Sequence, residues 1–180
     1  VYKDGRPFLI DIGVESYTQK TFSPQRYEIW TMQSGWHNLP QFDPDGAKYD
    51  QQPGAAFAAA DVTVTDALDG LAMDLAPAYG SVPGLGRYRR SVHLTDTGLT
   101  LRDETDYPGT VALTLMSVEK PAMDGDTVAF GALAAAAVTG ADKIVIEAVP
   151  ITDPRLRQAW PDTIYRTRIY FTQQLSLVIE

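Results

Sequence analysis

The chain of 180 residues contains no cysteine. That absence excludes a disulfide framework and thiolate chemistry, and it fits both the cytoplasm and the bacterial periplasm. Long apolar runs are missing as well. The alanine-rich run at 131–140 is much shorter than the ~18 apolar residues that a membrane-spanning helix needs. We therefore expect no membrane partner.

Positive charge is scarce. The sequence has 15 lysines and arginines against 23 aspartates and glutamates, and its net charge is −8. This balance disfavours nucleic acid as a partner, because a phosphate backbone needs clustered cations. A local basic groove could still bind an acidic polysaccharide. Arg87, Arg89 and Arg90 form the densest basic group, although a solvated face that pairs across strands is the simpler interpretation.

A secretory signal is also missing. The sequence starts at Val1-Tyr2-Lys3, without a charged segment followed by an apolar one. We expect an internal fragment whose targeting signal, if any, lay upstream. A periplasmic or secreted location is expected, with the cytoplasm as the alternative, and the oligomeric state stays open.

What the sequence does contain is a series of short alternating or apolar runs, about one in every ten residues, bounded by Gly, Pro, Asp and Asn. This pattern predicts an all-β fold: an antiparallel two-sheet sandwich of about a dozen strands, forming one domain over residues 1–180. One short helix is expected at 153–160, with Asp153 as its N-cap and Pro154 in its first turn. The expected strands are 8–12, 27–32, 37–42, 55–64, 70–76, 88–95, 99–102, 111–118, 127–130, 143–149, 163–172 and 175–179.

The chain has only two histidines, His37 and His93. On the strand expected at 88–95, His93 belongs to the polar face, whereas Tyr88 and Arg90 belong to the core face. Two imidazoles and the carboxylate of Asp61 on three strands could meet as a tetrahedral zinc site, with water or a further group as fourth ligand. The spacing alone fits hydrogen-bonded or surface side chains just as well.

The segment 4–40 carries a resemblance to a known family. The run Asp-Gly-Arg-Pro-Phe-Leu-Ile-Asp-Ile-Gly at 4–13, the segment 17–30, and the Ser-x-x-His-Asn element at 34–38 follow one another. Together they resemble the C-terminal β-sandwich of heparinase II/III-like proteins. Weaker similarity at 51–62, 74–76, 89–92 and 153–166 extends the resemblance over nearly the whole chain.

The resemblance implies a polysaccharide lyase acting on heparin, heparan sulfate, alginate or related uronate polymers. Such lyases pair this sandwich with an N-terminal helical toroid, which this chain does not contain. Several carry a zinc ion in the sandwich, and the ligands carried over to this sequence are His37, Asp61 and His93. Asp43 and Asp45 are rivals for the aspartate position, although Asp-Pro-Asp-Gly is more often a simple turn. Some members have a further histidine two residues before the first ligand, where this chain has Gly35.

Uronate lyases work by β-elimination, which needs a base, a group that neutralises the carboxylate and an acid. The resemblance places the principal catalytic residues in the toroid. The isolated sandwich is therefore expected to be inactive and to support the cleft, with Tyr17 and Arg26 as weak candidates for substrate contact. The alternatives are a carbohydrate-binding module and a purely structural sandwich. Trp30, Trp36 and Trp160 could stack on sugars in the module, but their apolar surroundings favour burial.

Overall fold

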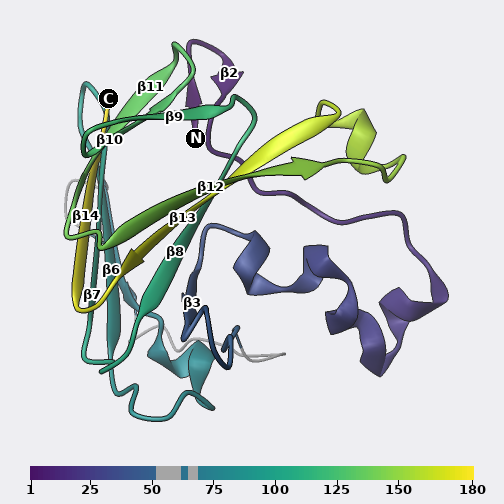
Figure 1. Cartoon of the computed structure of the whole chain (residues 1–180), viewed down its shortest axis with the longest axis horizontal. Helices are drawn as coiled ribbons and strands as arrows, with labels where there is room; N and C mark the ends of the chain where they lie inside the picture. Colours follow the sequence, from purple (N-terminus) through teal and green to yellow (C-terminus); the bar gives the residue numbers. More distant parts are fainter. Residues whose placement is uncertain (52–61, 65–68) are drawn as a thin grey trace.

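The computed structural model describes residues 1–51, 62–64 and 69–180 (Figure 1). Strands dominate it, and an eight-stranded antiparallel sheet faces a four-stranded one. The order in the large sheet is β4-β5-β6-β7-β14-β11-β10-β9, and in the small sheet β12-β13-β8-β3. The strands of the large sheet are β4 (Val62–Val64), β5 (Gly70–Asp74), β6 (Tyr88–Leu94), β7 (Leu99–Thr105), β9 (Pro121–Asp124), β10 (Thr127–Phe130), β11 (Ala134–Thr139) and β14 (Gln174–Ile179).

The small sheet consists of β3 (Pro40–Phe42), β8 (Val111–Ser117), β12 (Lys143–Pro150) and β13 (Thr163–Phe171). A separate two-stranded ribbon joins β1 (Tyr2–Lys3) to β2 (Arg6–Pro7). The described 3₁₀ helices are η1 (Gln19–Phe22), η2 (Pro24–Glu28), η3 (Trp30–Met32), η4 (Ser34–Trp36), η6 (Ala76–Tyr79) and η7 (Leu156–Gln158). No helix of the described residues is long and apolar enough to cross a membrane.

The main core lies between the two sheets. An aromatic cluster anchors it: the fully buried ring of Phe42 stands edge-on to Tyr79, Tyr88 and Tyr107, with centroids 4.9, 5.5 and 5.2 Å away. Edge-to-face pairs of this kind add to the burial of apolar area. Phe130 closes another part of the same core and packs against Phe8.

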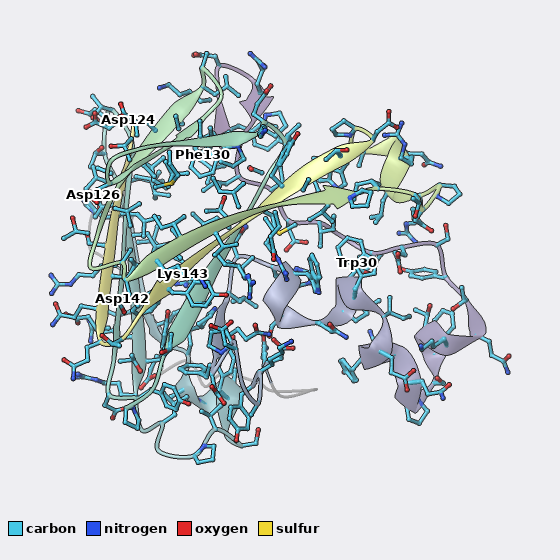
Figure 2. All side chains as sticks on the ribbon, viewed as in Figure 1. Trp30, Asp124, Asp126, Phe130, Asp142 and Lys143 are labelled. Carbon is cyan, nitrogen blue, oxygen red and sulfur yellow. The ribbon has the colours of Figure 1, made fainter. Side chains whose placement is uncertain are left out.

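A second core lies on the far side of the small sheet. It is formed by Ile10, Ile12, Met116, Ile164 and Leu156 with their neighbours, and Trp30, Trp36 and Trp160 pack against it. Figure 2 shows the difference: Phe130 lies between the sheets, whereas Trp30 lies beyond β12 and β13. The small sheet is thus covered on both faces, which explains why every residue of β8 is buried.

The cover over the second core is the segment 8–38, which we call the arm. After an extended start it winds through η1, η2, η3 and η4 beside β12 and β13 (Figure 1). Local signals shape its turns. Ser23 accepts a hydrogen bond from the backbone N–H of Gln25, and Pro24 occupies the first position of η2. The arm carries the Ser-x-x-His-Asn element at its end.

Comparison with the expectations confirms the all-β two-sheet sandwich and most of its strands. Of the strand expected at 55–64, residues 55–61 lie outside the described part of the chain and 62–64 form β4. The strand expected at 27–32 is wrong, because these residues form η2 and η3 and turn their tryptophan toward the second core. Residues 8–12 are buried except for Asp11, but they make only a single bridge, Leu9 to Ser117. β11 was missed because alanine gives little strand signal. The helix at 153–160 is reduced to η7, although Asp153 does accept from the N–H groups of Arg155 and Leu156.

Candidate functional site

The chain's only asparagine, Asn38, joins the arm to the sandwich. Its side-chain NH₂ donates to the carbonyl of Ile10 (2.9 Å), and its side-chain oxygen accepts from the N–H of Met116 in β8 (2.8 Å). Its own backbone carbonyl accepts from Arg90 Nη1 of β6 (2.7 Å). One residue therefore links the start of the arm, the small sheet and the large sheet.

His37 links two parts of the arm to each other. Its Nδ1 lies 2.7 Å from Asp11 Oδ2, and its Nε2 lies 3.1 Å from the carbonyl oxygen of Thr31. A carbonyl oxygen can only accept, so Nε2 carries a proton, and an ionised Asp11 requires a second proton on Nδ1. The bond to Asp11 raises the pKa of His37, and the same bond lowers the pKa of Asp11. The arrangement therefore favours a charged imidazolium.

His93 lies elsewhere. It is an exposed residue near the end of β6, with Nδ1 3.7 Å from Asp69 Oδ1. Side chains alternate along β6, and Arg90 points inward to Asn38, so His93 points to the outer face of the large sheet. The structure does not bring His37 and His93 together.

Asp61 lies outside the described residues. Within the part of the chain that is described, no three acidic or histidine side chains gather as metal ligands. The rival Asp43 shapes its own turn by accepting from the N–H of Ala47, and Asp45 accepts from the hydroxyl of Tyr170. Both ring nitrogens of His37 already have partners, and a zinc ion would have to displace one of them. The zinc site on His37, Asp61 and His93 stays a prediction.

The weak candidates Tyr17 and Arg26 both lie on the exposed side of the arm. The ring of Tyr17 is 57% exposed, meets Phe22 edge-on and lies 4.5 Å from the guanidinium carbon of Arg155. The guanidinium of Arg26 lies 5.4 Å from the ring centre of Tyr27. Arginine over an aromatic ring is a favourable cation–π arrangement. The arm thus presents two such pairs to solvent.

A buried charged pair lies beneath the arm. Arg90 donates to both carboxylate oxygens of Asp103, from Nε and Nη2, at 2.7 Å each, and Tyr88 donates to the same carboxylate at 2.6 Å. Burial alone would lower the pKa of Arg90, but Asp103 raises it. Burial, followed by the charge of Asp103, raises the pKa of Tyr88. Arg90 is therefore a structural residue, whereas Arg87 and Arg89 are exposed.

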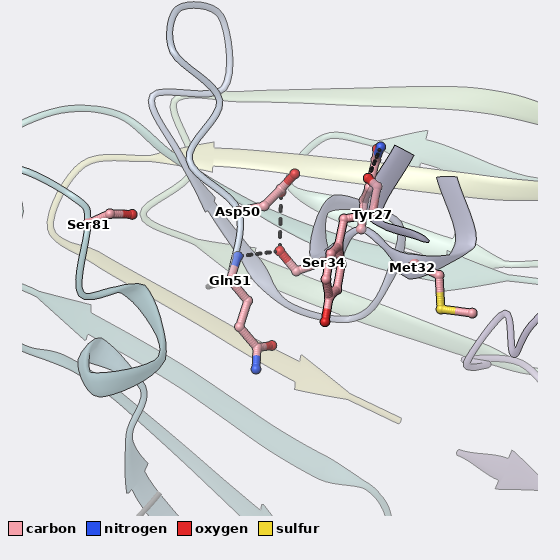
Figure 3. Close-up of a pocket in the computed structure, with 7 residues that line it drawn as sticks. Tyr27, Met32, Ser34, Asp50, Gln51 and Ser81 are labelled. Carbon is pink, nitrogen blue, oxygen red and sulfur yellow. Dashed lines mark hydrogen bonds between the residues drawn. The ribbon is translucent and has the colours of Figure 1, made fainter. Parts of the chain in front are cut away.

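A pocket of about 330 Å³ opens between the arm and the loop after η6 (Figure 3). Its lining includes Tyr27, Met32, Ser34, Gln51 and Ser81 together with Asp50. Figure 3 shows the Tyr27 hydroxyl and the Gln51 amide extending to the same side of the Ser34–Asp50 pair. Sequence reasoning did not find this pocket, because it assembles from 3₁₀ turns and loops that have no periodic signal.

The hydrogen bonds at the pocket hold Asp50 in place from one side. Its Oδ1 accepts from Ser34 Oγ (3.2 Å) and from Gln41 Nε2 (2.8 Å). Ser34 Oγ in turn accepts from the N–H of Gln51 (2.7 Å). Below them Tyr79 donates its hydroxyl to the carbonyl of Pro40 (2.7 Å), and burial raises its pKa. The pocket therefore offers a fixed carboxylate beside an aromatic wall.

Solved structures with the same fold are polysaccharide lyases. The chain is similar to a heparinase III with methylated lysines (TM-score 0.62, 14% identity), over 98% of this chain and 28% of that one. It is also similar to the heparan sulfate lyase HepC from Pedobacter heparinus (TM-score 0.54, 16% identity), over 97% of this chain and 28% of that one. No protein-family model matches the sequence, and no curated protein does.

These similarities establish the fold. Identities of 14–16% lie below the level at which a shared activity follows. The chain spans little more than a quarter of the length of these lyases, at 28%. Nearly all of it takes part in the match, including the arm. The fold of the sandwich with its arm is therefore shared with part of the heparinase III and heparan sulfate lyase structures.

Proposed function

We propose that the chain is the β-sandwich part of a polysaccharide lyase that cleaves uronate-containing polymers, either heparan-sulfate-like or alginate-like, by β-elimination. The observation that carries the proposal is the match of 98% of the chain to heparinase III at a TM-score of 0.62. The resemblance of the Ser-x-x-His-Asn element supports it from the sequence. A helical domain outside this chain completes the cleft, and the parent protein acts in the periplasm or is secreted.

The role of the sandwich in that lyase is to support the cleft and to hold part of the sugar chain. Elimination requires proton transfer by groups that can exchange protons with the substrate. Both ring nitrogens of His37 have partners, Asp11 and Thr31, so in this structure His37 holds two parts of the arm together. Tyr17 and Arg26 are exposed and suited to sugar contact.

Two assays test this function. The longer protein encoded by the whole reading frame should convert heparan sulfate or alginate into products with an unsaturated uronate, measured by ultraviolet absorbance. The 180-residue chain should give none. Elimination by the 180-residue chain would contradict the proposal that the sandwich only supports the cleft. A longer protein that is inactive on every uronate polymer would contradict the proposed lyase activity.

Zinc is a separate part of the proposal. A structural ion on His37, Asp61 and His93 would require His37 to give up its bond to Asp11 or Thr31 and to meet His93, from which it lies apart in this structure. Neutral imidazole with carboxylate is then a suitable donor set. Metal analysis of the purified chain should then find one zinc per molecule, which disappears in His37→Ala and in His93→Ala. A metal-free chain with unchanged thermal stability in the presence of zinc would reject the site.

A non-catalytic carbohydrate-binding sandwich is the second candidate. The observation that favours it is the exposure of Phe22 (79%), Tyr17 (57%) and Tyr27 (40%) on the arm. The tryptophans support it less, since Trp30 and Trp160 donate their indole N–H groups to Glu15 and to the carbonyl of Ile12 and pack on the second core. This candidate predicts sugar binding without lyase activity in the longer protein.

A further inference from the structure

We propose that the pocket between the arm and the η6 loop is a subsite for one acidic sugar residue, with Arg26 binding its carboxylate and Asp50 binding its hydroxyl groups. The inference deepens the proposed function and rests on it for the polymer class. Its own basis is the arrangement of unsatisfied polar groups around the pocket.

Among the described residues, hydrogen-bond donors reach only one of the two carboxylate oxygens of Asp50. Ser34 and Gln41 both donate to Oδ1, and no described residue donates to Oδ2. The two donors fix the plane of the carboxylate before any ligand arrives, which lowers the entropy that binding has to offset. A carboxylate oxygen accepts strong hydrogen bonds from hydroxyl groups. A saccharide offers such hydroxyls in adjacent pairs, and Gln51, which also lines the pocket, adds a second polar side chain.

Arg26 does not itself line the pocket, but it contacts two residues that do and carries the opposite charge to Asp50. Its guanidinium lies 5.4 Å from the ring centre of Tyr27, and its Nη2 lies 3.8 Å from the sulfur of Met32. Tyr27 and Met32 both line the pocket. Among residues 1–51, 62–64 and 69–180 no carboxylate forms an ion pair with Arg26. A guanidinium that contacts an aromatic ring and a thioether can still donate two N–H groups to a carboxylate ligand.

The shape of the pocket agrees with one sugar ring. Its volume of about 330 Å³ is at the lower end for small-molecule sites. The ring of Tyr27, which is 40% exposed, gives an apolar wall for the C–H face of the sugar. A uronate carries its carboxylate and its neighbouring hydroxyls on different edges of the ring. In the proposed complex Arg26, beside Met32, binds the carboxylate edge, and Asp50, beside Ser34, binds the hydroxyl edge.

Gly35 lies next to the hydrogen bond between Gln41 and Asp50. A Cβ on Gly35 would lie 2.8 Å from Gln41 Nε2 and 3.2 Å from Asp50 Oδ1. The missing side chain therefore leaves room for the hydrogen bond that orients Asp50. Where some lyases of the resembled family have a histidine, this chain has space for a different set of polar contacts.

The test measures binding of two probes to the 180-residue chain by titration calorimetry. One probe is an unsulfated heparosan tetrasaccharide, and the other is the same tetrasaccharide with its carboxylates reduced to alcohols. Arg26→Gln should weaken the acidic probe roughly tenfold, because a charge-assisted hydrogen bond is lost, and should leave the reduced probe unchanged. Asp50→Asn should weaken both probes. Arg89→Gln, which removes one exposed positive charge on the large sheet, is the matched control and should change neither.

Several outcomes would overturn the subsite. Binding of the acidic probe that Arg26→Gln and Asp50→Asn leave intact would reject it, while the lyase proposal would stand. Equal weakening of both probes by Arg26→Gln would reject the carboxylate contact. No binding of either probe would also reject the subsite, and the activity of the longer protein would still decide the lyase separately. Circular dichroism and thermal melting of each variant exclude a folding defect, and Arg26 is exposed, so its variant should fold normally.

Discussion

The sandwich and its arm are held together by different kinds of interaction. Between the sheets, large apolar side chains such as Phe130, Leu113 and Phe171 are fully buried, and long strand ladders fix their positions. The arm has only short 3₁₀ turns, and its contacts to the sandwich depend on the hydrogen bonds of Asn38 with Met116 and Arg90 and on half-buried tryptophans that pack on the second core. Cooperative packing makes the sandwich unfold as one unit, whereas the arm can open locally.

The largest effect is expected from Asp103→Ala in the sandwich. This change leaves Arg90 buried without its counter-charge, which costs about 3–5 kcal/mol in similar cases. Urea denaturation should show a loss of this size for the whole domain. Glu104→Gln on the same strand is the control, since the pair of Glu104 with Arg102 is largely exposed and is worth less than about 1 kcal/mol. Equal losses for the two variants would contradict the distinction.

A smaller effect, centred on the arm and its bond to β8, is expected from Asn38→Ala. The variant removes the partners of the Ile10 carbonyl and the Met116 N–H, and each unsatisfied buried group costs about 1–3 kcal/mol. Hydrogen exchange should accelerate in residues 8–38 and stay slow in β7 and β14. Uniform acceleration in all strands would show that the arm does not open separately from the sandwich.

The contrast between the regions also explains what the sequence could predict. Strands such as β6 and β13 follow from local alternation, and the inward position of Arg90 beside Tyr88 was visible in that alternation. The partner of Arg90 could be identified as Asp103 only from the register of β6 against β7, which places the two residues opposite each other. Alternation along β7 did indicate that Asp103 points inward, because it lies between the inward residues Leu101 and Thr105.

The arm could not be predicted in the same way. The segment around Tyr27 and Ile29 reads as a strand, because aromatic and β-branched residues favour strands wherever neighbours pair with them. Here no strand pairs with it, and the second core and the bond from His37 to Thr31 decide its shape. The pocket shares this origin, since Ser34, Asp50 and Ser81 come from three separate loops and turns. The separation of His37 from His93 has a related cause: alternation placed His93 on the polar face of β6, but His37 follows η4 in the arm, whose path no periodic pattern predicts.

The stabilisation of the arm by His37 is expected to depend on pH. The raised pKa of His37 means that its contribution is complete below the ordinary imidazole value of 6.5 and is lost as the pH rises through the higher folded value. The lowered pKa of Asp11 means that its contribution is present above 3.8 and is lost as the pH falls through the lower folded value. Arm protection in hydrogen exchange should therefore be greatest between these limits.

His37→Gln should flatten that pH dependence, whereas His93→Gln on the outer face of the large sheet should leave it unchanged. NMR titration of the His37 ring gives the same information directly. A His37 ring that titrates below 6.5 in the folded chain would contradict a charged imidazolium bound to Asp11.

The smallest effect on stability is expected from Gly35→Ala. The added methyl group meets the end of the Gln41 side chain, which can rotate away, so the free energy of unfolding should fall by only about 1 kcal/mol or less. Rotation of Gln41 removes one of the two donors to Asp50 Oδ1 and leaves the carboxylate less fixed. Calorimetry should then show weaker binding of both heparosan probes in a chain of nearly unchanged stability.

Gly125→Ala in the β9–β10 turn is the control for adding a methyl group. The φ of 57° at Gly125 makes that substitution strained, so it should lower stability by a comparable or larger amount while leaving sugar binding intact. Loss of binding in both variants would mean that destabilisation, and not the orientation of Asp50, weakens the site.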